Sequence, residues 1–416
     1  MSTNDTTAPA ASTELVKLEK AHIDLRSVKI QMVLAALLIL VTCVASRWQI
    51  IASGGLPGDE DSRTMELIST MFSETSGLSA VAFCHPLFML SLLPDTFLVE
   101  SFPRAPLLLN LCIVFATSLM VGLVVLEITG LYGNRLGAAP AMWAGLLSAV
   151  HPAQSFSDMA VVNRPDLLAH LFYVGALWSF LRFRLLAEKP YVGGSVLCLL
   201  LALLCGPFPE TATYPIAALM AVWLLHGRPA RATGLAARPS RSSIAYLLAS
   251  ALMVAGIFGA STALTAMEVN SPSGVLNRLH SDPISFTEAM ALVLPVRSGE
   301  GGQAVMIGSA AAYVGCLGLQ LMRVFMRAST TGPFLFASLW TFTMAAGMAV
   351  AQPQWLSEPQ LAAVPVCVLL ALAALPAVDA VGKRNARWLS IAGVITLSAA
   401  FLSWSTLLLE EVNKLQ

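Results

Sequence analysis

The sequence is poor in charged residues and has no long polar stretch that could form a separate soluble domain. Only 12% of its 416 residues are Asp, Glu, Lys or Arg, whereas 56% are hydrophobic. A water-soluble globule of this size needs far more polar surface than this balance supplies. The composition therefore excludes an ordinary soluble protein and indicates that a lipid bilayer is the solvent for most of the chain.

Paired cysteines, internal repeats and basic stripes are also missing. The seven cysteines are scattered, mostly through apolar stretches, without the spacing of a zinc site or a disulfide framework. The lack of a visible repeat disfavours a transporter of the inverted-repeat type. The 24 basic and 24 acidic residues balance to a formal net charge of zero, and no basic stripe lies on any one soluble surface, which argues against nucleic acid as a partner.

Apolar runs, by contrast, recur along the whole chain. About eleven of them are long enough to cross, or nearly cross, roughly 30 Å of hydrocarbon, which predicts an all-α, polytopic transmembrane helical bundle. The predicted spans are 30–46, 107–129, 139–151, 167–181, 190–205, 211–226, 243–265, 304–323, 333–351, 361–380 and 388–409.

The distribution of basic residues orients this bundle. With the N-terminus in the cytoplasm, most Lys and Arg residues lie on the inner side and most carboxylates on the outer side, as the positive-inside rule requires. Residues 1–29 are then interpreted as a disordered cytoplasmic tail, followed by one transmembrane domain over 30–410. The long outer loops are 47–106 and 266–303, and segment 78–93 within the first is interpreted as interfacial or re-entrant.

Three adjacent acids, Asp59, Glu60 and Asp61, follow a Gly- and Pro-rich turn soon after the first predicted span. Neighbouring carboxylates repel one another, so one of them can have a raised pKa and accept a proton, and the group could also hold a divalent cation. A solvated acidic turn is the alternative interpretation that requires no function.

A second group of polar residues lies in segment 149–180, which begins with His151-Pro and enters the next span through Arg164-Pro-Asp166. Asp166 suits a helix start, with an Arg partner, and this is the simplest structural interpretation. Arg164 and His151 near a membrane surface can equally hold a lipid phosphate. Glu210 opens another outer helix; it suits the helix dipole there, but an acid at this depth is costly unless it is paired or used.

These motifs resemble the signature of the GT-C membrane glycosyltransferases, closest to the transmembrane and tetratricopeptide-repeat-containing O-mannosyltransferases and their bacterial relatives. The family pattern is His-Pro-x-x-Thr-Glu, a short spacer and then Gly-Arg-x-Asp-Leu-Leu. The residues that match it in register are His151, Pro152, Arg164, Asp166, Leu167 and Leu168.

The resemblance extends to other outer helix ends. Asp59–Asp61 stand where the family has its catalytic acid, Asn110 matches the Asn of its His-x-x-Asn helix start, and Glu210 resembles its Glu after a short outer turn. Residues 270–281 are similar to its Asn-Pro loop that ends in Arg. Two features depart from the pattern: Phe156 replaces the signature Glu, with Asp158 as the nearest acid, and the repeat domain is not found in this sequence.

The resemblance implies an inverting glycosyltransferase with a polyprenyl-phosphate sugar donor and a protein or glycan acceptor on the outer side. Asp59 or Asp61, next to Glu60, would accept the acceptor's proton, without a metal or other cofactor. The other expected roles are donor phosphate binding by Arg164, Arg278, Arg297 and His151, and support from Asp158, Asp166, Glu210 and Asn110.

The expected location is a bacterial inner membrane, with membrane lipids as neighbours and the active side facing the periplasm. The main alternative is a non-catalytic GT-C-like scaffold subunit that packs against partners in a larger membrane complex, which the replacement of Glu by Phe156 favours. A flippase or transporter for lipid-linked sugars is a weaker alternative, because the charged residues gather at helix ends rather than midway along the spans.

Overall fold

The computed structural model describes the helical parts of the chain. Within the described residues the protein is all-α, with twelve helices, which confirms the all-α part of the predicted fold class. The described residues are 10–53, 86–98, 102, 104–131, 138–151, 164–186, 188–205, 209–225, 241–268, 314–315, 318–319, 331–350, 360–373 and 391–406.

The helices coincide, at least in part, with every predicted span except 304–323, of which only 314–315 and 318–319 are described. They are α1 (Ala10–Ser53), α4 (Pro86–Leu98), α5 (Ala105–Leu131), α6 (Ala138–Val150), α7 (Arg164–Leu186), α8 (Lys189–Cys205), α9 (Pro209–Ala212), α10 (Tyr214–Leu224), α11 (Arg241–Glu268), α14 (Thr331–Val350), α15 (Gln360–Ala373) and the helix Ile391–Thr406.

Two of these helices are long and apolar enough to cross a membrane by length and composition: the part of α1 over Ile30–Trp48, and α5. Six others are apolar but contain only 10–17 residues in their apolar part. The all-α architecture is thus confirmed, whereas the polytopic transmembrane arrangement, with its number of crossings and its orientation, stays a prediction.

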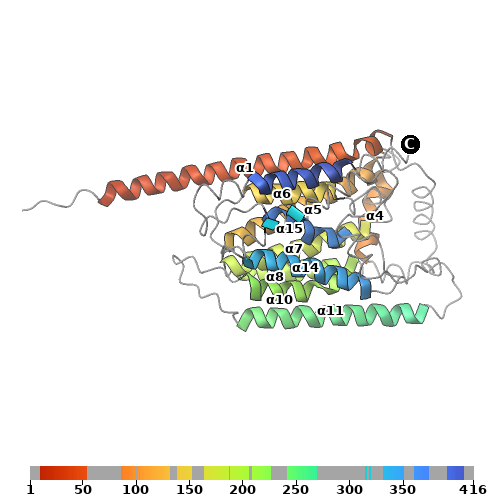
Figure 1. Cartoon of the computed structure of the whole chain (residues 1–416). Coiled ribbons are helices and arrows are strands. Elements are labelled where there is room, and N and C mark those ends of the chain that lie inside the picture. The colour runs from red at the N-terminus through yellow and green to blue at the C-terminus, as the bar shows by residue number, and fades with distance from the viewer. Residues whose placement is uncertain are drawn as a thin grey trace, which may run out of the picture.

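The long helices lie side by side, with α1 along one edge of the bundle and α11 along the opposite edge (Figure 1). Between these edges α7 packs on α5 and α8, and α6 packs on α1, α5 and α15. The short helix α4 lies near the end of the bundle where α1 ends, and it packs on α5, α7 and α8 (Figure 1). Because α5 and α7 begin there and α6 and α8 end there, this end collects the segments predicted to face the outer compartment.

Small residues allow α1, α5 and α6 to approach closely. A Cβ atom on Gly145 would lie 2.4 Å from Ile39 Cδ1 and 3.0 Å from the Ser118 carbonyl oxygen, and one on Gly122 would lie 2.8 Å from the Ala141 carbonyl oxygen. Contacts of this kind, with glycine where two backbones meet, are typical of helices packed in membranes.

Hydroxyl groups join α7, α8, α10 and α11 inside the bundle. Ser195 Oγ donates to the Ala176 carbonyl oxygen (2.7 Å) and lies 2.9 Å from the Tyr214 hydroxyl and 2.5 Å from the Tyr246 hydroxyl. The two tyrosine hydroxyls are 2.7 Å apart. In a bilayer, buried polar side chains find such partners only on neighbouring helices, so this cluster ties four helices together.

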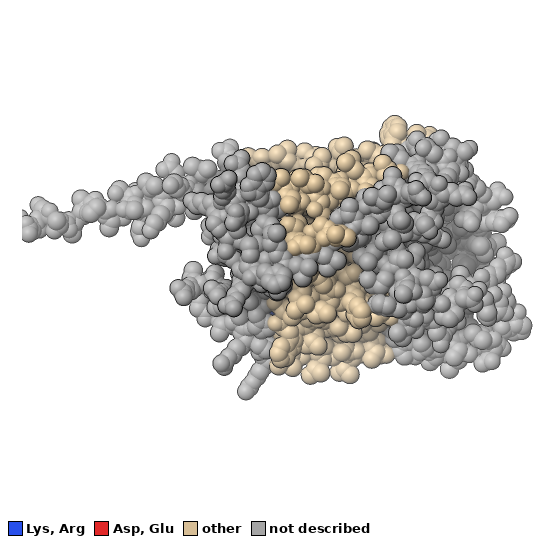
Figure 2. All heavy atoms as spheres, viewed as in Figure 1, with Lys and Arg blue, Asp and Glu red and all other residues tan. Residues whose placement is uncertain are grey.

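The outward faces of the edge helices are apolar. Val33 and Val41 of α1, Leu252 of α11 and Trp223 of α10 are each more than half exposed. In the view of Figure 2, the described surface shows no Lys, Arg, Asp or Glu. Exposed apolar side chains on neighbouring helices, with no charged residue between them in this view, are typical of a surface covered by lipid or by another protein.

The structure corrects the prediction of a disordered tail over residues 1–29. Residues 10–29 belong to α1, and residues 1–9 lie outside the described part of the chain. The segment is rich in Glu, Leu, Lys and Ala, which favour helix, and it continues a helix already nucleated by the apolar run that follows. The outer loop predicted over 47–106 is likewise shortened, because α1 runs to Ser53 and the loop contains α4.

Candidate functional site

Arg164, the first residue of α7, lies fully buried at the end of the bundle that contains α4. Its Nε donates to Asn110 Oδ1 (2.7 Å), its Nη1 to the Ser91 carbonyl oxygen (3.0 Å), and its Nη2 to the Pro106 carbonyl oxygen (3.3 Å). Nη1 also forms an ion pair with the carboxylate of Asp95. Every nitrogen of the guanidinium thus has a protein acceptor, and this group of Arg164, Asp95 and Asn110 is called the Arg164 cluster below.

The cluster joins three helices that are separate in the sequence. Asp95 and Ser91 belong to α4, Asn110 and Pro106 to α5, and Arg164 to α7. An unpaired charge at this depth would be strongly unfavourable, and a planar guanidinium can satisfy several acceptors at once. Arg164 therefore holds the short helix α4 against the first turns of α5 and α7.

Local sequence explains the placement of Arg164 and Asp166. Pro165 is compatible with the first helical turn because the amide it lacks would have no partner there. A positive charge at a helix N-terminus opposes the helix dipole, whereas the carboxylate of Asp166 in the same turn favours it. The negative charge of Asp95 offsets the unfavourable position of Arg164.

Asp95 is the residue that the sequence interpretation missed. Its side chain is buried, and burial raises the pKa of its carboxyl, while the hydrogen bond and positive charge of Arg164 oppose that shift. The sequence does contain a feature that points to Asp95, because it is the sole charged residue within the apolar segment 86–98. A lone carboxylate in such a segment requires a partner, but the predicted interfacial segment ended at residue 93.

Asp166 is also buried, and its charge acts on the thiol of Cys205 at the end of α8. This places the start of α7 beside the end of α8. The carboxylate recorded in an ion pair with Arg164 is Asp95, so the predicted role of Asp166 in holding Arg164 is filled at least in part by a residue from α4.

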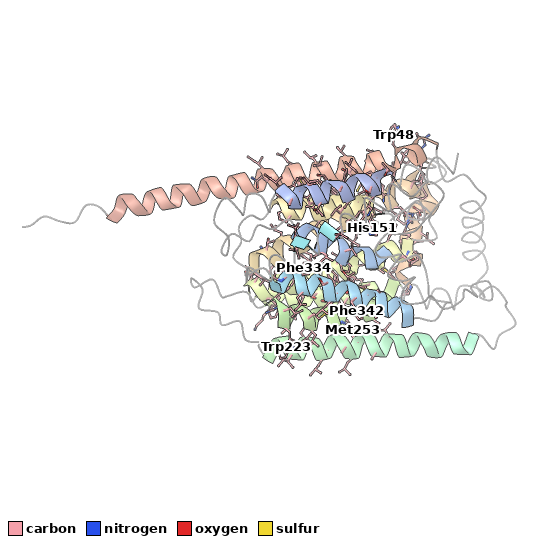
Figure 3. All side chains as sticks on the ribbon, viewed as in Figure 1. Trp48, His151, Trp223, Met253, Phe334 and Phe342 are labelled. Carbon is pink, nitrogen blue, oxygen red and sulfur yellow. The ribbon has the colours of Figure 1, made fainter. Side chains whose placement is uncertain are left out.

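His151 is buried at the end of α6, where its ring contacts Trp404 of the helix 391–406 edge to face, at 4.6 Å between ring centroids (Figure 3). Arg47, near the end of α1, is also buried. Its Nη1 donates to the Ala149 carbonyl oxygen in the last turn of α6 (3.1 Å) and to Ser46 Oγ (2.9 Å). The His151 ring therefore packs against an aromatic side chain. Arg47 is a buried cation at the same end of the bundle that the sequence analysis did not single out.

All three predicted catalytic acids, Asp59, Glu60 and Asp61, lie outside the described part of the chain. The same holds for Arg278 and Arg297, predicted to bind the donor phosphate, and for Asp158, predicted as a supporting residue. Glu210 belongs to α9, but its side chain is not among those described.

The helix ends that flank the acidic turn are nevertheless placed. Arg104 Nη2 donates to the Ala52 carbonyl oxygen (3.4 Å), which joins the start of α5 to the end of α1. Because Arg164 contacts the first turn of α5, the end of α1 and the start of α7 share one end of the bundle. The acidic residues 59–61 follow α1 by only a few residues in the sequence.

The described part of the chain contains no group of three or more His, Cys, Asp or Glu side chains that could hold a metal ion. A small apolar hollow, lined by Met32, Leu119 and Met142 among others, lies between α1, α5 and α6. Leu119 is about 13 Å along α5 from Asn110, from the helical rise per residue. The hollow therefore does not belong to the Arg164 cluster.

No protein-family model, no curated protein and no solved structure matches the chain.

Proposed function

We propose that the protein is a polytopic membrane protein that transfers a sugar from a polyprenyl-phosphate donor to an acceptor at the end of the bundle where α4 lies. The observation that carries this proposal is the Arg164 cluster, which contains a fully buried ion pair within a predominantly apolar bundle. Ionisable residues inside membrane proteins are costly and are retained mainly where they serve a function. The motif that supplies Arg164 is also the one that resembles the GT-C signature.

The location supports the first half of the proposal. The chain is 56% hydrophobic, the described surface in the view of Figure 2 shows no charged residue, and two helices pass the length and composition requirements for a span. α7 has 23 residues and α14 has 20, lengths of about 30 Å or more at the helical rise per residue. We assign the cluster to the outer side, the periplasmic side of a bacterial inner membrane, by the positive-inside rule.

In the proposed reaction, a hydroxyl oxygen of the acceptor attacks the anomeric carbon of the sugar. The bond from that carbon to the phosphate oxygen breaks, the electron pair stays on the polyprenyl phosphate, and the hydroxyl proton passes to Asp59 or Asp61. Attack in line with the leaving group inverts the configuration at the anomeric carbon. No metal is required for a monophosphate leaving group that is neutralised by arginine.

The geometry changes the role proposed for Arg164. Its nitrogens already have protein acceptors, so a donor phosphate would have to displace Asp95 to reach it. We therefore propose Arg164 as a positioning residue that holds α4 and the loop before it, and assign the phosphate contact to Arg278 or Arg297.

One product is common to all donors of this class, and it tests the proposal without knowledge of the sugar. The full chain in nanodiscs is expected to bind polyprenyl phosphate, as measured by native mass spectrometry. It is also expected to release polyprenyl phosphate from polyprenyl-phosphate hexoses or pentoses, with the hydroxyl of water taking the sugar in place of the acceptor. D59N together with D61N should abolish release and leave binding and membrane abundance unchanged.

The matched control is E188Q, which alters an exposed acid in the turn between α7 and α8. This variant should behave like the wild type. A wild-type protein that binds no polyprenyl phosphate, or a D59N/D61N double variant with undiminished release, would refute the sugar-transfer proposal.

A non-catalytic scaffold subunit is the second candidate, and one observation favours it. Each guanidinium nitrogen of Arg164 has a protein acceptor, as expected of a purely structural ion pair, and Phe156 stands where the family has Glu. A scaffold predicts that D59N/D61N has no effect, that disruption of the Arg164 cluster lowers abundance, and that a partner complex is lost with it.

A further inference from the structure

The polarity of α4 is the reverse of what a helix on a water-exposed surface shows. Leu92 and Asp95 face the bundle and are buried, and Arg164 contacts the backbone of Ser91 on the same side. On the outward side lies an apolar stripe in which Leu90 is 59% and Phe97 77% exposed. The full stripe consists of Leu90, Leu93, Pro94, Phe97 and Leu98.

The members of this stripe follow helical spacing, since they stand three, four, seven and eight residues after Leu90. No charged or polar side chain interrupts it. A helix on the surface of a soluble protein turns such a stripe toward the core and its carboxylate toward water. α4 does the opposite, so its outward neighbour is an apolar medium.

The depth of α4 in the bundle identifies this medium. Through Ser91 and Asp95 its inner face contacts Arg164, the first residue of α7, and Arg164 in turn donates to Pro106 and Asn110 near the start of α5. α4 therefore packs against the ends of these helices rather than lying beyond them. Trp48 is exposed near the end of α1 at the same end of the bundle (Figure 3). Exposed Arg104, directly before α5, contacts the last turn of α1.

Tryptophan at the membrane surface and arginine that extends toward head groups both mark the boundary between hydrocarbon and water. The apolar exterior of α1, which carries exposed Val41 and Leu37, continues up to this level. Along the bundle axis, the stripe on α4 therefore lies at the level of Trp48 and Arg104, where the lipid around the bundle would change from acyl chains to head groups.

We infer that α4 is an in-plane interfacial helix whose apolar stripe is embedded among the acyl chains of the outer-leaflet phospholipids, while Asp95 and Arg164 fix it to the bundle. This inference rests on the membrane location in the proposed function and not on sugar transfer. An interfacial helix usually turns its charged face to water. Here the charge faces the protein, so the ion pair sets the depth of the helix from the inside.

Photo-crosslinking tests the inference in the full-length chain in native membranes. The substitution is Phe97→p-benzoylphenylalanine, which is conservative in shape and placed at an exposed position. After irradiation and digestion, mass spectrometry is expected to find phospholipid adducts on the peptide that contains residue 97. Their yield should be similar to that from Trp223→p-benzoylphenylalanine, on the exposed face of α10, and several-fold above that from Glu188→p-benzoylphenylalanine, in the turn between α7 and α8.

Other outcomes overturn the inference. Adducts with a second copy, with another protein or with a segment of the same chain would show that protein covers the stripe. An adduct with the mass of a polyprenyl chain would assign it to the donor, and a yield no higher than at Glu188 would place it in water. Binding of polyprenyl phosphate, measured on the same membranes, separates this result from the proposed function, because each can fail while the other holds.

Discussion

α7 carries an Arg–carboxylate pair near each of its ends, and the two pairs differ in burial. At the N-terminal end of α7, the Arg164 and Asp95 side chains are 0% and 2% exposed. Toward the other end, Arg182 Nη1 lies 2.8 Å from Glu127 Oε1, with Arg182 35% and Glu127 4% exposed. Arg182 also lies over the ring of Tyr191, at 5.9 Å from its centroid.

The difference in burial implies different costs. Arg182 keeps part of its guanidinium in solvent, and a partly exposed pair of this kind contributes little to stability. Arg164 has lost its hydration completely, and a buried pair often stabilises less than apolar residues of the same size would. The Arg164–Asp95 pair is therefore better explained by its role in holding α4 in place than by the stability it adds.

The largest expected effect is that of removing one partner of the buried pair. R164A should destabilise the protein by about 3–5 kcal/mol, because it leaves the Asp95 carboxylate buried without its cation. Denaturant unfolding of the purified protein in detergent micelles measures this. The control is L93A on the outward face of α4, and an R164A protein as stable as L93A would show that the pair does not hold α4.

Replacement of each arginine by lysine tests whether the two pairs on α7 differ in their demand for a guanidinium. R164K should cost about 2 kcal/mol, because an ammonium group cannot serve Asn110, Pro106 and Asp95 at once. R182K should cost less than about 0.5 kcal/mol, because a partly solvated ammonium can still approach Glu127. Equal losses in the two variants, measured by the same unfolding experiment, would contradict the distinction drawn here.

The smallest effect is expected when both buried charges are removed together. R164L with D95L should lie within about 1 kcal/mol of the wild type, since no uncompensated charge remains. If Arg164 acts as a positioning residue, this double variant should still lose most polyprenyl phosphate release although it is folded and abundant. Full release by the double variant would limit the pair to a structural role.

Part of this site followed from the sequence. Arg164, Asp166 and Asn110 were predicted at outer helix ends, and the structure brings Arg164 and Asn110 into direct contact, at 2.7 Å. That prediction was possible because helix ends have local signals: Pro165 and Asp166 in the first turn of α7, and an apolar run after each. Asp95 was missed because its local sequence does not indicate that its partner is Arg164, 69 residues further along the chain.

The fold shows the same division. The helices were predicted nearly everywhere, because long apolar runs can satisfy their backbone only as helices in a bilayer. The disordered tail was wrong over residues 10–29, where helix propensity and continuity with the first apolar run outweighed the polar composition. The roles of Asp59, Glu60, Asp61, Asp158, Arg278 and Arg297 stay predictions, since these residues lie outside the described part of the chain.

The helical, apolar character of this protein and the position of its charges at helix ends are readable from the amino-acid sequence, because these properties depend on composition and on neighbours along the chain. Which charges pair, and which face of α4 is outward, depends on how the helices pack. The reason is physical: a buried arginine must be neutralised by whichever acceptors the packed helices bring to it, and that choice depends on contacts between residues far apart in the sequence.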